Sequence, residues 1–190
     1  PSIVIFNNWI KVNLLIRVKS SKTHDIYNYM DGPLKNLLVV DLTRVLVGPY
    51  CTMILSDLGA RVIKIEAPEI GDDSRKFGPF VEDYSAYFMS LNRGKESIAL
   101  NLKNFEDKKI FEKILSKADI LVENFKPGTL EKWGYGWKEV NKKFPKLIYA
   151  SASGFGQTGP LKELPAYDMV VQGMGGLMSV TGQPNSEPTR

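Results

Sequence analysis

The sequence predicts an α/β fold, a Rossmann-like parallel sheet with helices on both faces, over residues 34–190. Short apolar runs with the length of buried strands lie near residues 37, 61, 98, 119 and 147. Between them, apolar side chains recur at helical spacing over stretches of about ten residues. Strands and helices that alternate in this way are typical of parallel sheets. Residues 1–33 do not follow the pattern, and we expect them to be a separate leader.

The first strand-helix-strand unit lies within residues 37–66. Its expected strand, turn, helix, left-handed stop and second strand are Leu37–Leu42, Gly48-Pro49, Tyr50–Leu58, Gly59 and Arg61–Glu66. The unit lacks G-x-G-x-x-G, so it does not predict a pyrophosphate clamp for NAD. Ligands of such units bind beyond the carboxyl ends of the strands, which are residues 43–47 and 67–71 here. A unit with only a structural role has the same pattern.

The alternation continues to residue 152. The expected strands are Ser97–Leu102, Asp119–Glu123 and Leu147–Ala152. The expected helices are Ser85–Leu91, a helix capped by Asn104, a short helix opened by Pro127-Gly128, and Trp137–Phe144. In the helix after Asn104, one face is apolar, with Ile110, Phe111, Ile114, Leu115 and Ala118.

A glycine-rich turn and a further helix follow the last strand. Gly154, Gly156 and Gly159-Pro160 favour turns, and Asp168 comes where the polar loop gives way to an apolar run. A carboxylate at a helix N-terminus is favoured as a cap and by the helix dipole. Asp168 can therefore be an N-cap or a functional carboxylate.

Composition and charge exclude several classes of protein. Of the 190 residues, 43% are hydrophobic and 24% charged, which suits one globular domain with a sizeable core. The net charge of +4 is concentrated in residues 1–30, so the remaining chain does not predict a nucleic-acid-binding surface. No apolar run has the length of a membrane span. The basic residues 1–33 suit either an organelle transit peptide or a frayed or mispredicted leader.

The single cysteine and the single histidine narrow the chemistry. Cys51 alone cannot form an internal disulfide, which suits a reducing interior, and its apolar helix pattern predicts a buried thiol. His24 lies in the leader. Ser-His-Asp hydrolases, histidine-dependent acyltransferases and histidine-rich metal sites are therefore not predicted, and we expect no metal site.

Cations and an aromatic side chain follow the later strands. Leu100–Lys103 and Asn124–Lys126 end neighbouring strands, and Lys132 lies nearby. Lysines attract phosphates, and Phe125 can pack on a base or an acyl arm, so this edge suits a nucleotide. Scattered surface lysines are the alternative.

Five motifs, in order and in register, are similar to those of the family III CoA-transferases, the group that includes formyl-CoA transferase, carnitine CoA-transferase and the 2-methylacyl-CoA racemases. They are Gly48-Pro49 with Leu58-Gly59-Ala60, Val62–Glu66, Asn92–Lys95 with Ser97-Ile98, Val122–Phe125 with Pro127-Gly128, and Gly154–Pro160. Gly71–Arg75 and Gly78–Phe80 most resemble the succinyl-CoA:glutarate CoA-transferase branch. Family members are longer, so the resemblance implies an incomplete large domain over 34–190.

The resemblance implies a set of CoA-binding residues. These are Val45, Leu46, Ala67, Leu100, Asn101, Leu102, Lys103, Asn124, Phe125, Lys126 and Lys132. It also implies that Leu46, Tyr167 and Asp168 line the active site. Family members with an arginine at the position of Ala67 use it on the nucleotide, which leaves Arg75, Arg93 or Lys95 as replacements here. Lys132 keeps the charge of a frequent arginine without its planar fork.

The implied reaction moves CoA from an acyl-CoA to a carboxylic acid through aspartyl intermediates, with succinyl-CoA and a dicarboxylate as first substrates and no permanently bound cofactor. By motif order the nucleophilic aspartate lies just beyond Arg190, so we expect no catalytic residue within 1–190. A racemase of the same fold uses a histidine where Tyr167 stands, and a phenol is a poor base at neutral pH. A non-catalytic CoA-binding protein is the third alternative. The family also implies an interlocked homodimer, and the branch a mitochondrial location.

Overall fold

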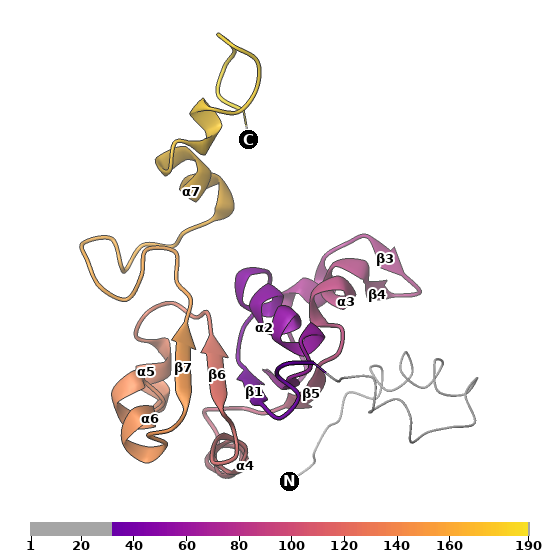
Figure 1. Ribbon diagram of the computed structural model, residues 1–190, viewed down its shortest axis with the longest axis vertical. Coiled ribbons are helices and arrows are strands. Elements are labelled where there is room, and N and C mark those ends of the chain that lie inside the picture. The colour runs from indigo at the N-terminus through magenta and orange to yellow at the C-terminus, as the bar shows by residue number, and fades with distance from the viewer. Residues whose placement is uncertain (1–31, 190) are drawn as a thin grey trace.

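The computed structural model describes residues 32–189 and contains a five-stranded parallel sheet (Figure 1). The strands are β1 Leu38–Asp41, β2 Arg61–Glu66, β5 Glu96–Ala99, β6 Ile120–Glu123 and β7 Ile148–Ser151. They lie in the order β5-β2-β1-β6-β7, so the chain starts in the middle of the sheet. It builds outward through β2 and β5 and then returns to the other side of β1. The α/β prediction is confirmed. His24 and all but the last two residues of the expected leader, residues 1–33, lie outside the described part of the chain.

The helices are α2 Val47–Asp57, α3 Ala86–Asn92, α4 Phe105–Leu115, α5 Thr129–Trp133, α6 Trp137–Lys143 and α7 Asp168–Met174, with 3-10 turns η2 Asp73–Lys76 and η3 Leu177–Ser179. A short hairpin, β3 Phe80–Val81 and β4 Tyr84–Ser85, lies in the stretch expected to be loop. Val39 and Val122 pack with α2 on one face of the sheet. Val40 and Leu121 pack with α4, α5 and α6 on the other, because successive strand residues point to opposite faces.

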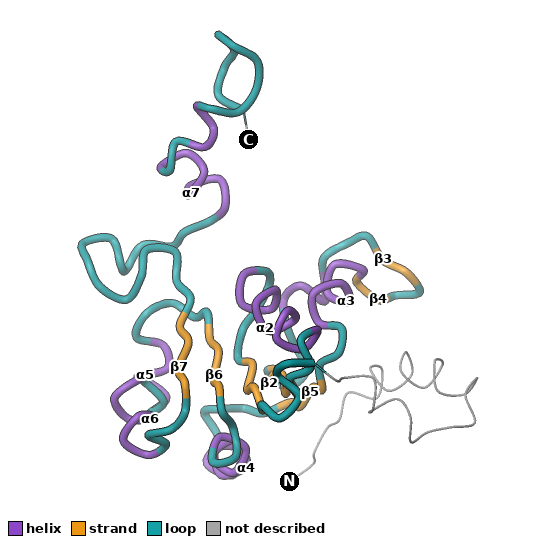
Figure 2. Tube along the Cα trace, viewed as in Figure 1, coloured by secondary structure: helices purple, strands orange, loops and turns teal. Residues whose placement is uncertain are grey.

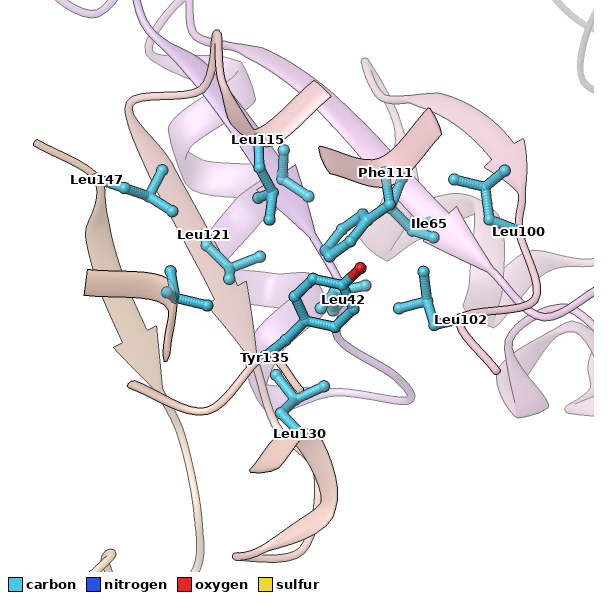
Figure 3. Packing of buried hydrophobic residues seen from close by; sticks show 12 residues of the cluster. Leu42, Ile65, Leu100, Leu102, Phe111, Leu115, Leu121, Leu130, Tyr135 and Leu147 are labelled. Carbon is cyan, nitrogen blue, oxygen red and sulfur yellow. The ribbon is translucent and has the colours of Figure 1, made fainter. Parts of the chain in front are cut away.

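The larger core lies under α4, α5 and α6 (Figure 3). Phe111 is fully buried there, and its ring meets the ring of Tyr135 edge-on, with centroids 4.9 Å apart. The expected cap is present, since Oδ1 of Asn104 accepts a hydrogen bond from the Glu106 N–H at 2.8 Å. The apolar face that the sequence predicted for α4 therefore builds this core.

Helix α2 begins earlier than expected. Gly48 and Pro49, expected to form a turn, lie in its first turn. N–H groups of a first helical turn have no partner within the helix, so Pro49 sacrifices no hydrogen bond there. A Cβ on Gly48 would lie 2.2 Å from Cβ of Thr43. Only glycine therefore lets α2 start this close to the end of β1.

Cys51 is exposed, so the prediction of a buried thiol is wrong. The buried side of α2 is formed by Gly48, Pro49, Thr52, Met53 and Ser56. Thr52 faces inward because its hydroxyl donates to the buried carboxylate of Asp41 at 2.6 Å. Cys51 points away from this polar contact, which hydropathy alone could not indicate.

The chain divides into a sheet unit (residues 32–151) and a C-terminal segment (residues 152–189). Figures 1 and 2 show the C-terminal segment as a long loop followed by α7 and η3, which extend away from the sheet. Neither α7 nor η3 has a buried residue. Among the described residues, no helix is long and apolar enough to cross a membrane.

Candidate functional site

A cavity of about 530 Å³ lies at the carboxyl ends of β1, β2 and β5. Six of the predicted CoA-binding residues line it, namely Ala67, Leu100, Asn101, Leu102, Lys103 and Phe125. They meet because the carboxyl ends of parallel strands share one edge of the sheet. The structure thus places these residues around one cavity, and their contact with CoA remains a prediction.

Other predicted CoA-binding residues lie outside the lining of the cavity. Val45 and Leu46 lead into α2. Lys126 is exposed, and its Nζ lies 4.0 Å from a carboxylate oxygen of Glu163. Lys132 is exposed on α5. Contact between these four residues and CoA therefore remains a prediction.

Tyr167 and Asp168 lie at the start of α7, in the C-terminal segment, and do not line the cavity. Tyr167 occupies the N-cap position, so Asp168 is the first helical residue and not the cap. Its Oδ2 accepts a hydrogen bond from Nε2 of Gln172 at 2.6 Å. The lining of the active site by Leu46, Tyr167 and Asp168 remains a prediction.

One wall of the cavity is aromatic. The rings of Phe125 and Trp133 meet edge to face, with centroids 5.3 Å apart and an interplanar angle of 69°. The sequence analysis included Phe125 and missed Trp133, which is the last residue of α5. Aromatic faces of this kind pack well on a base or an apolar arm.

Asn124 acts on the main chain beside the cavity. Its Oδ1 accepts from the Arg44 N–H at 2.8 Å, and its Nδ2 donates to the Arg44 carbonyl at 2.8 Å. Asn124 follows β6 and Arg44 follows β1, so this pair of hydrogen bonds ties the two strand ends together where the strand order reverses. Arg44 lines the cavity; it lies within residues 43–47, where the sequence predicts ligand binding, but it was not among the predicted CoA-binding residues.

Lys64 forms part of the cavity floor although its side chain is only 1% exposed. Its Nζ donates to the Thr43 carbonyl at 2.7 Å and pairs with Asp72 at 2.9 Å. Buried cations need such partners, since an unpaired charge in the interior is strongly unfavourable. Lys64 therefore holds the end of β1 in place.

Asp72 connects this floor to the loop that precedes α2. Its carboxylate accepts from the Val45 N–H at 3.1 Å and from the Ser74 hydroxyl at 2.7 Å, in addition to Lys64. Burial alone would raise the pKa of Asp72, but the charge of Lys64 and the hydrogen bonds from Ser74 bring that pKa below its ordinary value. Asp72 stays ionised at neutral pH.

Glu66 completes a group of charged side chains below the cavity, which we call the buried ionic floor and which consists of Lys64, Asp72, Glu66 and Arg75. Arg75 donates to both of its carboxylate oxygens at 2.7 Å, and the Ser97 hydroxyl donates as well. Burial opposes ionisation, but Arg75, Ser97 and Lys64 together lower the pKa of Glu66. The branch-like segment Gly71–Arg75 thus contributes Asp72 and Arg75 to the interior.

A second buried cation lies beneath β1. Lys95 donates to Oδ2 of Asp41 at 3.1 Å, to the Pro49 carbonyl at 2.9 Å and to Oδ1 of Asn92 at 2.9 Å. Burial lowers the pKa of Lys95 to about 8, against the opposing effect of Asp41. The sequence analysis did not predict that Lys64 and Lys95 are interior residues. Across residues 32–189, no group of three or more His, Cys, Asp or Glu side chains is placed to hold a metal ion.

A family model described as CoA-transferase family III matches residues 34–190. The chain belongs to this family. It is 58% identical over 159 residues to the acetyl-CoA:oxalate CoA-transferase of Acetobacter aceti, covering 84% of this chain and 41% of that protein. It is 46% identical over 159 residues to the human succinyl-CoA:glutarate CoA-transferase, covering 83% and 36%.

Solved structures agree with this assignment. A CAIB/BAIF family protein from Brucella suis superposes with a TM-score of 0.79 at 45% identity, covering 84% of this chain and 43% of that one. The family III resemblance is therefore confirmed, together with the fold that it implied. The chain spans about two fifths of the length of the curated relatives that it matches.

Proposed function

We propose that the protein is an enzyme that moves CoA from an acyl-CoA donor to a carboxylic acid acceptor, with the sheet unit supplying the nucleotide site. The observation that supports this most is the cavity, which combines the exposed Lys103 and the partly exposed Arg44 with an aromatic wall in a chain of CoA-transferase family III. Acyl-CoA is then a substrate, and no permanently bound cofactor is needed.

The side chains around the cavity suit coenzyme A. Lys103 is exposed and can attract its phosphates, and Phe125 with Trp133 can pack on adenine or on the pantetheine arm. Two main-chain amides beside the cavity are not free to bind phosphate oxygens. The Asn101 N–H donates to Asp107 at 2.8 Å and the Lys103 N–H donates to Asn101 at 3.0 Å, so both are already occupied.

We further propose a dicarboxylate acceptor. Oxalate and glutarate, in the names of the two relatives, are both dicarboxylates, whereas the donors named are acetyl-CoA and succinyl-CoA. The branch resemblance, carried by Gly78–Phe80 and by Gly71–Arg75, favours glutarate as the first acceptor to test. Because Asp72 and Ser74 of that segment are buried, it supports the cavity floor and gives little reason to prefer glutarate over oxalate.

The reaction that we propose uses an aspartate outside residues 1–190. Its carboxylate attacks the donor thioester carbonyl, which releases CoA thiolate and leaves a mixed anhydride. The thiolate attacks the aspartyl carbonyl, which releases the donor acid and leaves an aspartyl-CoA thioester. The acceptor carboxylate then attacks this thioester, which releases CoA thiolate and leaves a second mixed anhydride. The thiolate attacks the acceptor's acyl carbonyl in that anhydride, which yields the new acyl-CoA and the free aspartate carboxylate. Asp168, with Tyr167 and Leu46, would orient acyl groups.

The test is CoA exchange by the protein at its natural length. Acetyl-CoA or succinyl-CoA is mixed with oxalate or glutarate, and the CoA esters are separated by chromatography. New oxalyl-CoA or glutaryl-CoA is the expected product, and hydroxylamine added during turnover should convert the nucleophilic aspartate, a residue other than Asp168, to its hydroxamate. Binding of CoA without exchange would favour a non-catalytic CoA-binding protein. Loss of α-proton stereochemistry in a 2-methylacyl-CoA would favour a racemase.

Two finer proposals accompany this function. We propose an interlocked homodimer, on the family resemblance, and a mitochondrial location, on the resemblance to the branch that includes the human and mouse succinyl-CoA:glutarate CoA-transferases. Light scattering coupled to size exclusion checks the first, and a monomer would contradict it. Fractionation of cells that make the protein checks the second.

A further inference from the structure

None of the arginines that the sequence analysis considered for binding the phosphates of a nucleotide lines the cavity. Ala67 brings no charge, although it lies in the lining. The replacements expected from the sequence are engaged elsewhere, since Arg75 pairs with Glu66, Arg93 with Asp57, and Lys95 is buried against Asp41. None of the three lines the cavity, whereas Arg44 does.

The main chain at Arg44 is fixed from both sides. Asn124 engages both its N–H and its carbonyl at 2.8 Å. On one side the Thr43 carbonyl accepts from buried Lys64, and on the other the Val45 N–H donates to buried Asp72. These partners come from three separate elements, since Asn124 follows β6, Lys64 lies within β2 and Asp72 precedes η2, so residues 43–45 cannot shift without breaking contacts in the floor of the cavity.

Val45 shows how strongly this segment is held. Its φ is +68°, in the left-handed region that a β-branched residue rarely adopts. Such a conformation persists only where surrounding contacts impose it, and it is common beside ligand sites. The contact from Asp72 at the Val45 N–H imposes it here. The main chain that carries Arg44 is thus held by its neighbours before any ligand arrives.

The side chain of Arg44 has only a weak partner. Its Nη1 lies 3.7 Å from Oδ2 of Asp73, and the two side chains are 38% and 50% exposed. Exposed pairs of this kind contribute at most about 1 kcal/mol. A phosphate, which an arginine binds through two parallel hydrogen bonds, can therefore displace Asp73 readily.

We propose that Arg44 is the phosphate-binding arginine of this cavity, that Asp73 occupies it until a nucleotide enters, and that Asn124 is a positioning residue acting through the Arg44 main chain. The inference rests on the proposed function, because it takes CoA as the ligand. It differs from the family-derived expectation in the residue that supplies the charge and in the role of Asn124.

The first experiment is calorimetric titration of CoA into the protein at its natural length. Arg44→Gln should weaken binding about 10-fold to 100-fold, the loss of a charge-assisted contact, and Arg44→Lys should weaken it less. Asp73→Asn should tighten it about twofold to fivefold. Dephospho-CoA distinguishes the phosphates: if Arg44 binds the 3′-phosphate, the effect of Arg44→Gln disappears with that ligand, and if it binds the pyrophosphate, the effect remains.

The matched control is Arg61→Gln, at the amino end of β2, where an exposed arginine pairs with Glu96 at 2.7 Å. It should leave CoA affinity unchanged. A double variant tests Asn124: Asn124→Ala should weaken binding in the wild-type background and have no further effect in Arg44→Gln. Equal effects in both backgrounds would overturn the positioning role.

The outcomes separate the inference from the proposed function. If wild type binds CoA and Arg44→Gln binds it equally well, Arg44 is not the phosphate ligand, and only this inference fails. If wild type binds no CoA, the proposed function fails and the inference fails with it. Because Arg44 is partly exposed, its variants should fold, and circular dichroism confirms this before titration.

Discussion

In the sheet unit, α4 and α6 bury Phe111, Leu115 and Val140 against the strands, whereas α7 in the C-terminal segment buries none of its residues. Both regions have apolar side chains at helical spacing. Met174 of α7 is 61% exposed, and Phe111 of α4 is 0% exposed. An apolar helix pattern therefore identifies a face that is suited to burial. Whether that face is buried among the described residues depends on whether the helix packs against the sheet.

The largest expected effect comes from the core of the sheet unit. Phe111→Ala should lower the free energy of unfolding by about 3 to 5 kcal/mol, because it removes a fully buried ring and leaves a cavity. Val171→Ala, in exposed α7, should change it by less than about 0.5 kcal/mol. Urea unfolding followed by circular dichroism measures both. Similar losses would break the comparison.

A substitution in the buried ionic floor should lower the free energy of unfolding almost as much. Lys64→Met removes the cation beside Asp72 and leaves a buried carboxylate unpaired, which should reduce stability by about 3 kcal/mol. The matched change is Lys126→Met, since Lys126 pairs across the exposed junction with Glu163 at 4.0 Å. That change should remain below about 1 kcal/mol. A stable Lys64→Met protein would show that the floor tolerates an apolar side chain.

Acid should lower the stability of the protein by protonating the carboxylates of the buried ionic floor. The pKa values of Glu66 and Asp72 are lowered from ordinary values of 4.5 and 3.8. Their stabilisation is therefore complete above those ordinary values and is lost as the pH falls through the lower values of the folded state. Urea unfolding between pH 7 and pH 3 should show this loss. Asp72→Asn should start less stable and lose less on acidification, and an equal loss would argue against Asp72.

The smallest expected effect is a difference between two methionines in their rate of oxidation. Dilute hydrogen peroxide should oxidise Met174, which is exposed in α7, well before Met53, which is 6% exposed in α2. Peptide mass spectrometry over a time course measures the two rates. Protection of Met174 in the protein at its natural length would show that something outside the described residues covers α7.

Local sequence was sufficient for the five strands of the sheet, for most of its helices and for part of the site, but not for the β3–β4 hairpin or for the start of α2. Strand and helix patterns predicted the parallel sheet, and Asn104 predicted the start of α4. Because the carboxyl ends of parallel strands share an edge, the sequence also predicted that Leu100–Lys103 and Phe125 lie together, and all of them line the cavity. The order of the motifs predicted the family.

Only the tertiary structure decided which polar groups are interior. Lysine side chains usually lie at the surface, yet those of Lys64 and Lys95 are 1% exposed. Asn124 reaches Arg44 across 80 positions of the chain. Hydropathy and periodicity report how a residue relates to its near neighbours in sequence, so they determined the elements. Hydrogen bonds between residues on different strands depend on the order and register of the strands. The position of Arg44 and the burial of the two lysines therefore follow from the packing of β2 and β6 on either side of β1.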